Sequence, residues 1–406
     1  MQRQLRSAAV LLFVPALLAS CSAAQATATT TPTPRPASTP TPAAATPSPT
    51  PAVPPGPYAV IVSNAPRVGS TYDVILIDVL GHIVARVTAK LPLLKPNQTL
   101  QLPLVSASGD LAYYLDGDTT IRSLSPSGAS APVKTIPDGS SSIIAFAVSP
   151  DDQRIAVSLI KQGSDLAHNT GRGYVEGLTD GANRVNLFNN TAQDAFRWPV
   201  GWHGAQVVDG VGIQCSGYCS GNSGNNGAPG SFHVINSSTA SRTATVCESP
   251  FPPPTNENYN DSVNGMPVAA GIACTESEYY YATNSTPPRF AAKLLAVDWS
   301  GHEATFLTGD SQGGLPYGAC YLAPAGTQMA CTANASQALT LLAPGVSPHN
   351  LGRRYNVLGW IDDKHIAVDI DSATLGVLST DTGAVVNIAL TDADKMQMTA
   401  ILPGAL

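Results

Sequence analysis

The sequence has little charge. Asp, Glu, Lys and Arg make up 12% of its 406 residues, about half of the roughly 25% that soluble domains usually carry. The 21 basic residues are outnumbered by 28 acidic ones, the net charge is −7, and no basic stripe is present. Binding to nucleic acid requires basic side chains that neutralise phosphates. We therefore expect no nucleic-acid partner.

Recognisable catalytic motifs are missing as well. No Gly-x-Ser-x-Gly elbow occurs, and the Gly-rich stretch GNSGNNG (221–227) lacks the Lys-Ser/Thr that would follow a phosphate-binding loop. We predict no catalytic residues, no cofactor and no metal site. The alternative is an enzyme that cleaves cell-envelope glycan with two loop carboxylates, for which Glu176 with Asp165 or Glu276 is the candidate pair.

Cysteine is nearly absent from the first two hundred residues, where Cys21 stands alone. It follows Arg3, Arg6 and the apolar run AAVLLFVPALLA, which together predict an export signal over residues 1–20. The run falls short of the about 20 residues that a transmembrane helix needs. Leu18-Ala19-Ser20-Cys21 resembles the lipobox of bacterial lipoproteins. The resemblance implies that Cys21 is acylated and becomes the first residue. The alternative is ordinary cleavage, for example after Ala24, with loss of Cys21.

A long segment rich in Pro, Thr and Ala follows this cysteine. Residues 22–57 carry one charge, Arg35, and almost no large apolar side chain, so they cannot form a core and are expected to be disordered. We interpret residues 21–57 as a lipidated tether and residues 58–406 as the functional domain. The expected location is the extracytoplasmic side of a bacterial membrane, reached through the lipid anchor.

Turn formers and apolar residues are abundant instead. The chain has 35 Gly and 34 Pro, and 43% of its residues are hydrophobic, a composition that favours many short strands joined by turns. Two strand–turn–strand patterns alternate along it. The first occurs at 105–114, 148–157, 322–331 and 359–368, and more loosely at 201–208. The second occurs at 73–87, 120–133, 184–196, 233–246, 294–307 and 375–388.

Together these patterns give a four-strand unit every 40–50 residues, the period of propeller blades. The turns, clearest in SPDD at 149–152, resemble those of TolB-like and WD40-like β-propellers. The resemblance implies an all-β propeller of about seven blades, with six or eight as alternatives. YAVIVS (58–63) lacks an innermost strand before it, and MQMTAILPG (396–404) is expected to supply that strand and close the ring. A pair of β-sandwich domains is the alternative fold.

Six cysteines remain after Cys21, an even number that favours disulfides in an exported chain. Cys320 and Cys331 lie symmetrically about the Ala325-Gly326 turn, so a hairpin centred there would pair them. The other expected pairs are Cys215 with Cys219 and Cys247 with Cys274. The alternative for CSGYC (215–219) is metal binding together with His203 or His233.

Long loops are expected on one face of the propeller. The turns within strand pairs a–b and c–d are short, whereas five connections of the other kind are long: 161–182, 214–230, 247–264, 284–291 and 344–356. Such loops often carry function. They contain Tyr and Arg side chains, which are favoured contact residues. The candidate ligand-binding residues are Arg172, Tyr174, Tyr218, Tyr259, Arg289, Arg353 and Tyr355.

These features predict a monomeric binding or scaffold module that contacts a protein or an envelope glycan through its long-loop face. Besides the glycan-cleaving enzyme, a purely structural envelope protein is the remaining alternative.

Overall fold

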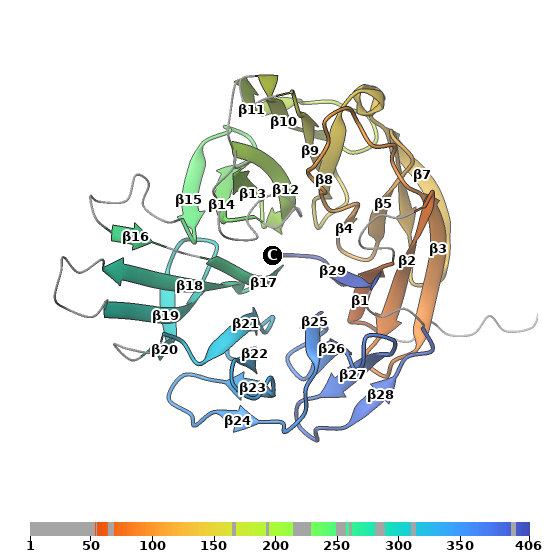
Figure 1. Cartoon of the computed structure of the whole chain (residues 1–406). Helices are drawn as coiled ribbons and strands as arrows, with labels where there is room; N and C mark the ends of the chain where they lie inside the picture. The colour runs from red at the N-terminus through yellow and green to blue at the C-terminus, as the bar shows by residue number, and fades with distance from the viewer. Residues whose placement is uncertain are drawn as a thin grey trace, which may run out of the picture. The chain divides into compact units, whose positions relative to one another are not determined.

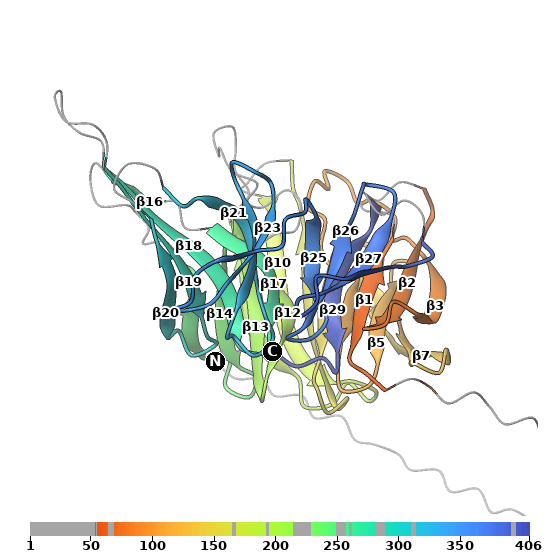
Figure 2. The ribbon, with the colours of Figure 1, turned by 90° about the horizontal axis from the view of Figure 1, so that it is seen from below.

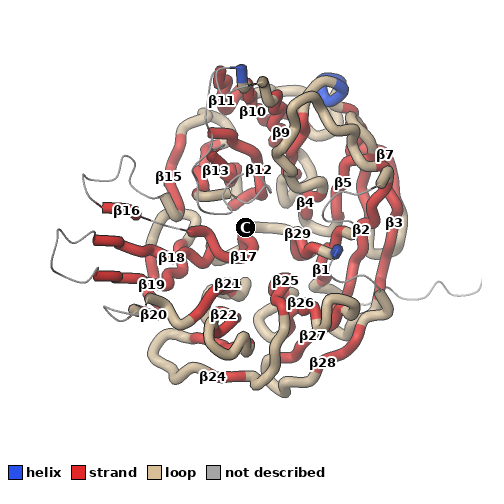
Figure 3. The backbone as a smooth tube through the Cα atoms, viewed as in Figure 1, coloured by secondary structure: helices blue, strands red, loops and turns tan. Residues whose placement is uncertain are grey.

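The computed structural model describes Val53 and residues 55–63, 69–164, 168–191, 195–213, 229–248, 257–259, 262–280, 289–309, 314–390 and 395–406. All of them belong to one unit, Ala52–Leu406. Their regular structure consists mainly of the 29 strands β1–β29, which Figure 3 shows around the ring, and it includes a short 3₁₀ helix, η1 (Pro137–Ser140). Within this part of the chain, no helix has the length and apolar character needed to cross a membrane.

The strands form seven sheets arranged as blades around a central axis (Figure 1). We number the blades 1–7 in chain order and call the strands of each blade a to d from the axis outward. Blade 1 contains β29 (Gln397–Leu402), β1 (Tyr58–Val62), β2 (Thr71–Asp78) and β3 (Ile83–Lys90). Blade 2 contains β4 (Val105–Ala107), β5 (Ala112–Asp116), β6 (Thr120–Leu124) and β7 (Ser130–Thr135). Blade 3 contains β8 (Ile143–Val148), β9 (Arg154–Lys161), β10 (Thr170–Gly177) and β11 (Val185–Thr191).

Blades 4–7 continue the ring with the same order of strands. Blade 4 contains β12 (Ala195–His203), β13 (Gln206–Ile213), β14 (Ser231–Asn236) and β15 (Arg242–Val246). Blade 5 contains β17 (Ser262–Val268), β18 (Gly271–Tyr280), β19 (Arg289–Val297) and β20 (Glu303–Thr308), with β16 (Glu257–Tyr259) also paired to β18. Blade 6 contains β21 (Tyr317–Leu322), β22 (Met329–Ala333), β23 (Leu339–Leu342) and β24 (His349–Asn350), and blade 7 contains β25 (Asn356–Trp360), β26 (His365–Asp369), β27 (Leu375–Ser379) and β28 (Val385–Asn387). The predicted seven-bladed, all-β propeller is confirmed.

The ring is closed by the last strand, as the sequence predicts. In blade 1, β29 is antiparallel to β1, with Tyr58 opposite Leu402 and Val62 opposite Gln397. Closure of this kind removes the open sheet edge that an incomplete first blade would leave. Strand b of blade 1 therefore comes from the start of the domain and strand a from its end.

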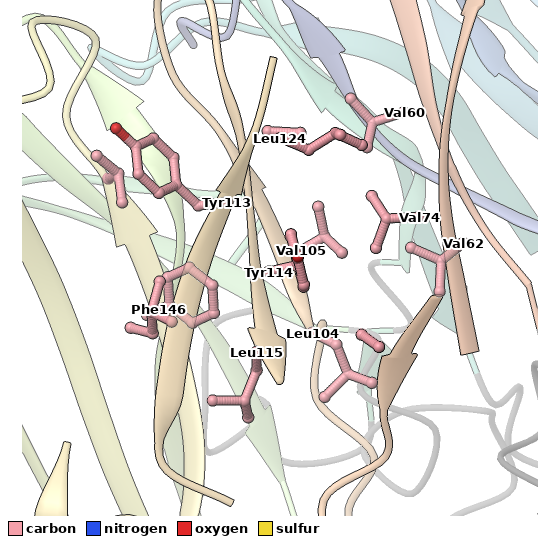
Figure 4. Packing of buried hydrophobic residues seen from close by; sticks show 14 of the residues in the cluster. Val60, Val62, Val74, Leu104, Val105, Tyr113, Tyr114, Leu115, Leu124 and Phe146 are labelled. Atoms are coloured by element: carbon pink, nitrogen blue, oxygen red, sulfur yellow. The ribbon is translucent and has the colours of Figure 1, made fainter. Parts of the chain in front are cut away.

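Alternation along each strand builds the cores between blades. Because successive strand residues point to opposite sides of a sheet, Val60 and Val74 of blade 1 pack toward blade 2, whereas Ile61 and Ile75 pack toward blade 7. Figure 4 shows part of the core between blades 1 and 2, which extends to Phe146 of blade 3. Each buried Val, Leu or Ile side chain contributes about 1.5–3 kcal/mol to folding.

The short turns follow a repeated chemistry. The Asp78 carboxylate in the β2–β3 turn accepts hydrogen bonds from the backbone N–H groups of Leu80 and His82, at 2.9 and 2.8 Å. Asp298 does the same for Ser300 and His302 in the β19–β20 turn, at 2.8 and 2.9 Å. Carboxylates that bond to nearby backbone groups stabilise tight turns. The two Gly-His turns are thus equivalent corners of the repeat.

Four local predictions are wrong. Residues 161–182, expected to be a long loop, contain strand β10. Residues 184–196, expected to form one hairpin, instead contribute β11, the outermost strand of blade 3, and the start of β12, the innermost strand of blade 4. Since β10 occupies the third place in blade 3, the following strand must be the fourth. Residues 344–356 include the short strand β24, and residues 247–264 include β16 and the start of β17.

Two predicted disulfides are present. Cys320 and Cys331 lie opposite each other in the β21–β22 hairpin and are bonded, with Cα atoms 4.1 Å apart. Cys247, just after β15, is bonded to Cys274 of β18, with Cα atoms 5.9 Å apart. This second bond links blade 4 to blade 5. The predicted pair Cys215–Cys219 lies outside the described residues, as does Cys21.

Candidate functional site

The propeller has two distinct faces, which Figure 2 shows edge-on. Because adjacent strands are antiparallel in every blade, all a–b and c–d turns lie on one face and all b–c and d–a connections on the other. We call the first the short-turn face and the second the long-loop face. Tyr58 begins β1 and Leu402 ends β29 on the short-turn face.

A cavity of about 600 Å³ runs along the axis of the ring. This axial cavity lies within the 300–1,000 Å³ range of small-molecule sites. Every innermost strand or a residue beside it contributes to its wall. Met396, Val263 and Val357 line it near the long-loop face, and Pro324, Asp362 and Asp363 near the short-turn face.

The wall of the axial cavity is chemically simple. Its side chains are mostly aliphatic or aromatic, and they include Trp198, Trp202 and the flexible thioethers of Met266 and Met398. Met side chains adapt to ligands of different shape. In each blade the innermost strand is bonded within its sheet on one side, so its other edge faces the axis. Edge strands offer backbone donors and acceptors. The cavity therefore suits a ligand that is apolar and carries amide-like groups.

Residues 403–406, which we call the tail, lie across the short-turn end of this cavity. Pro403, Gly404, Ala405 and Leu406 all contribute to its lining, and the chain ends at the centre of the ring in Figure 1. The Leu406 N–H donates to the carbonyl oxygen of Trp202 at 2.8 Å. On the long-loop side, Pro103 and Pro229, which precede β4 and β14, contribute to the lining.

Arg172 and Tyr174, two of the predicted site residues, lie on strand β10 rather than on a loop. Arg172 forms an ion pair with Asp138 and borders a second, polar cavity of about 320 Å³ together with Lys161 and Asn189. Tyr174 is buried, the guanidinium of Arg184 lies 4.0 Å from the centre of its ring, and burial raises the pKa of its hydroxyl. Arg172 is thus available for contact on the long-loop face, whereas Tyr174 is a core residue.

Arg353 and Tyr355 lie between blades 6 and 7. Arg353 is exposed and donates from Nη1 to the hydroxyl of Tyr355 at 3.3 Å. Tyr355 is buried in the core between these blades. Since Arg172 belongs to blade 3, the structure does not bring these predicted residues together.

The remaining predicted site residues are placed only in part. Tyr259 ends β16 and Arg289 begins β19, and only their backbones are described. Tyr218 lies outside the described residues.

Two carboxylates of the glycan-cleaving alternative, Glu176 and Glu276, are held in ion pairs. Glu176 is buried, with Lys134 Nζ at 2.8 Å and Arg184 Nη2 at 2.6 Å from its oxygens. Glu276 is paired with Lys293 at 2.9 Å. Asp165 lies outside the described residues. Glu176 is thus held between two cations.

One buried polar cluster in blade 4 was not predicted from the sequence. Asp209 of β13 is fully buried, and burial raises the pKa of its carboxyl to about 7 although Arg197 acts in the opposite direction. His233, opposite Asp209 on β14, has its pKa lowered to about 4 by burial and by Arg242 and Arg197. The sequence signal is an Asp within the apolar strand QVVDGVGI (206–213).

No group of three or more His, Cys, Asp or Glu side chains suited to a metal is found among the described residues. His203 is engaged by the tail, since its Nδ1 lies 2.6 Å from the carbonyl oxygen of Leu406. The CSGYC stretch of the metal alternative is outside the described residues.

Comparisons with known proteins add similarity of fold. No family model matches the chain, and no curated protein matches it. Among solved structures it is similar to an oligogalacturonate lyase in complex with manganese, with 10% identity over 78% of this chain and 81% of the other and a TM-score of 0.43. It is also similar to a putative TolB from Agrobacterium tumefaciens, with 11% identity over 82% and 88% and a TM-score of 0.31. An acylaminoacyl peptidase from Pyrococcus horikoshii shares 10% identity over 82% of this chain and 52% of that one, with a TM-score of 0.44.

Proposed function

We propose that this chain is a lipid-anchored, extracytoplasmic binding module whose ligand occupies the axial cavity and enters it from the long-loop face. Cys21 is the proposed lipid attachment point, and residues 22–57 connect it to the propeller. The ligand class that fits the wall is an apolar compound or segment without net charge.

This proposal rests on the axial cavity. At about 600 Å³ it has the volume of a ligand site, and it is larger than the polar cavity beside Arg172. Binding there would remove apolar ligand surface from water, which contributes about 25 cal/mol for each Å² buried. Among the predicted residues, Arg172 and Arg353 lie at the long-loop end of their blades and would meet a ligand or partner at the entrance.

A fluorescent apolar probe tests the cavity. N-Phenyl-1-naphthylamine should bind the purified protein with a saturable rise in fluorescence, and Leu358→Trp should reduce its affinity at least tenfold. Leu358 belongs to β25 and lines the cavity, so the larger indole would fill the space. Leu93→Trp is the matched control, because Leu93 is 71% exposed in the connection between β3 and β4. Equal probe binding by both variants would exclude the axial cavity.

Fractionation of cells tests the anchor separately. Cys21→Ser should release the protein from membranes into the soluble extracytoplasmic fraction, because acylation of the thiol supplies the hydrophobic attachment. Continued membrane retention of Cys21→Ser would contradict acylation at this position.

A further inference from the structure

The tail is held by its backbone to two distant blades. The Gly404 N–H donates to the carbonyl oxygen of Ser108, which follows the innermost strand of blade 2. The Leu406 N–H donates to the carbonyl oxygen of Trp202 in blade 4, and the Leu406 carbonyl oxygen accepts a hydrogen bond from His203 Nδ1. Two of these bonds join backbone N–H groups of the tail to backbone carbonyl oxygens at the ends of innermost strands, so the contact uses main-chain groups that any peptide carries.

The side chain of Leu406 packs into a defined apolar site. It packs with Val200 against the apolar core between blades 4 and 5, and a Cβ atom at Gly201 would overlap it. Gly404 passes so close to Ala107 that a side chain at position 404 would overlap that residue. The surface therefore accepts a small residue at one position and an aliphatic residue two positions later.

Closure of the ring does not depend on the tail. The last residue of β29 in the β1–β29 ladder is Leu402, which lies opposite Tyr58. Residues 403–406 come after this ladder and contact blades 2 and 4. They behave as a ligand attached to the domain rather than as part of a blade.

We propose that the short-turn end of the axial cavity is a peptide-recognition site and that the tail is its intramolecular occupant. The partner it fits is a protein that presents an extended, uncharged segment with a small residue followed two positions later by an aliphatic one. This inference rests on the proposed function, because it assigns a partner to the second end of the same cavity. The chemistry favours a peptide, since the observed contacts are backbone bonds plus one aliphatic side chain.

A partner must compete with the tail. An attached segment acts at an effective concentration on the order of millimolar, so a free peptide binds the intact chain weakly. The apparent dissociation constant equals the intrinsic one divided by the fraction of molecules in which the tail is undocked. Release of the tail therefore increases affinity for a free peptide, whereas a merely structural role for the tail predicts no such gain.

Fluorescence anisotropy with a fluorescein-labelled peptide ILPGAL, the sequence of residues 401–406, tests this on the full chain. Leu406→Asp removes the aliphatic anchor of the tail, and Gly404→Val makes the tail overlap Ala107. Both variants should bind the peptide at least tenfold more tightly than the unaltered protein. Adding Gly201→Val to Leu406→Asp should abolish binding of the peptide, because the valine side chain would occupy the space that the terminal leucine of the peptide needs.

Two controls keep the result interpretable. The peptide ILPGAD should not bind any variant, and Leu93→Asp, which alters an exposed leucine away from the tail, should leave peptide affinity unchanged. No gain in affinity with a folded Leu406→Asp and a folded Gly404→Val protein overturns the inference. The same proteins are titrated with N-phenyl-1-naphthylamine, so that failure of the peptide site is distinguished from failure of the axial cavity.

Discussion

Arg197 on β12 and Asp209 on β13 place opposite charges on the same side of the blade 4 sheet. The register pairs Arg197 with Val211, two residues along β13 from Asp209, so both side chains point toward blade 3. Neither oxygen of the Asp209 carboxylate has a hydrogen-bond partner among the described residues, and the guanidinium of Arg197 lies 4.1 Å from the centre of the Phe188 ring. Burial outweighs the attraction of Arg197, which leaves the carboxyl near half-protonated at neutral pH.

Asp209→Asn should flatten the dependence of stability on pH. The pKa of Asp209 is about 7 in the folded chain and about 3.9 in an unfolded one. Between these values the folded state binds more protons, so the free energy of unfolding decreases as pH rises from about 4 to 7. The difference of three pKa units corresponds to a loss of at most about 4 kcal/mol in the free energy of unfolding. Urea unfolding at several pH values should show Asp209→Asn gaining stability over the unaltered chain as pH rises. The exposed Asp381→Asn is the control and should show no such gain.

His233→Gln should have the opposite effect at acid pH. The folded pKa of His233 is about 4, below its unfolded value of about 6.5, so the folded state favours the neutral ring. Stability is therefore lost as pH falls from about 6.5 to 4, by about 2–3 kcal/mol. Urea titrations should show that His233→Gln loses less stability than the unaltered chain over this interval. Parallel curves for the two proteins would contradict a depressed pKa.

Glu176→Gln should destabilise the fold by about 3 kcal/mol. It leaves the Lys134 ammonium, whose side chain is 9% exposed, without its buried anionic partner, and removal of one member of a buried pair is costly. Glu276→Gln is the matched control: its pair with Lys293 is more exposed, so the loss should stay below about 1 kcal/mol. Chemical denaturation measures both. A loss of turnover on envelope polysaccharide in Glu176→Gln, with stability unchanged, would instead favour the glycan-cleaving alternative.

Replacing both Cys320 and Cys331 by Ala should cost about 2–3 kcal/mol. The bond closes a short loop, with a sequence separation of 11, and cross-links of this size restrict the unfolded chain by about that amount. The double variant should unfold at lower denaturant concentration than the unaltered protein. Because a reducing agent also breaks the Cys247–Cys274 bond, the comparison is between the two proteins: if Cys320 and Cys331 were unbonded, the difference in their stability would be the same with and without a reducing agent.

The architecture could be predicted because it depends on local chemistry. Turns such as SPDD (149–152) and the two Gly-His corners are stabilised by side chains within a few residues. Closure by residues 396–404 could be predicted because an unpaired first strand and a spare last strand require each other. β10 escaped prediction because its sequence, TGRGYVEG, has three glycines and polar flanks that resemble a loop.

The candidate site was harder to predict, because its residues come together only when the seven blades close into a ring. The seven innermost strands that surround the axial cavity are far apart in sequence, and each alone resembles an ordinary buried strand. Exposed aromatic and basic residues were predicted on the long-loop face, yet Tyr174 and Tyr355 are buried. The stretch PGAL (403–406) has no motif, and its position across the axis depends on contacts with blades 2 and 4.

The place of β1 in the first blade also determines how the domain bears mechanical load. A pull on residue 57 acts on the first residue of a strand that is bonded on both sides, to β2 and to β29. These ladders are loaded along their length, so many hydrogen bonds resist together in shear instead of opening one after another. An innermost or outermost strand at the same place would be bonded on one side only. Tension applied at residue 57 would therefore enter the propeller through a strand with partners on both sides, and β29 would share the force applied to β1.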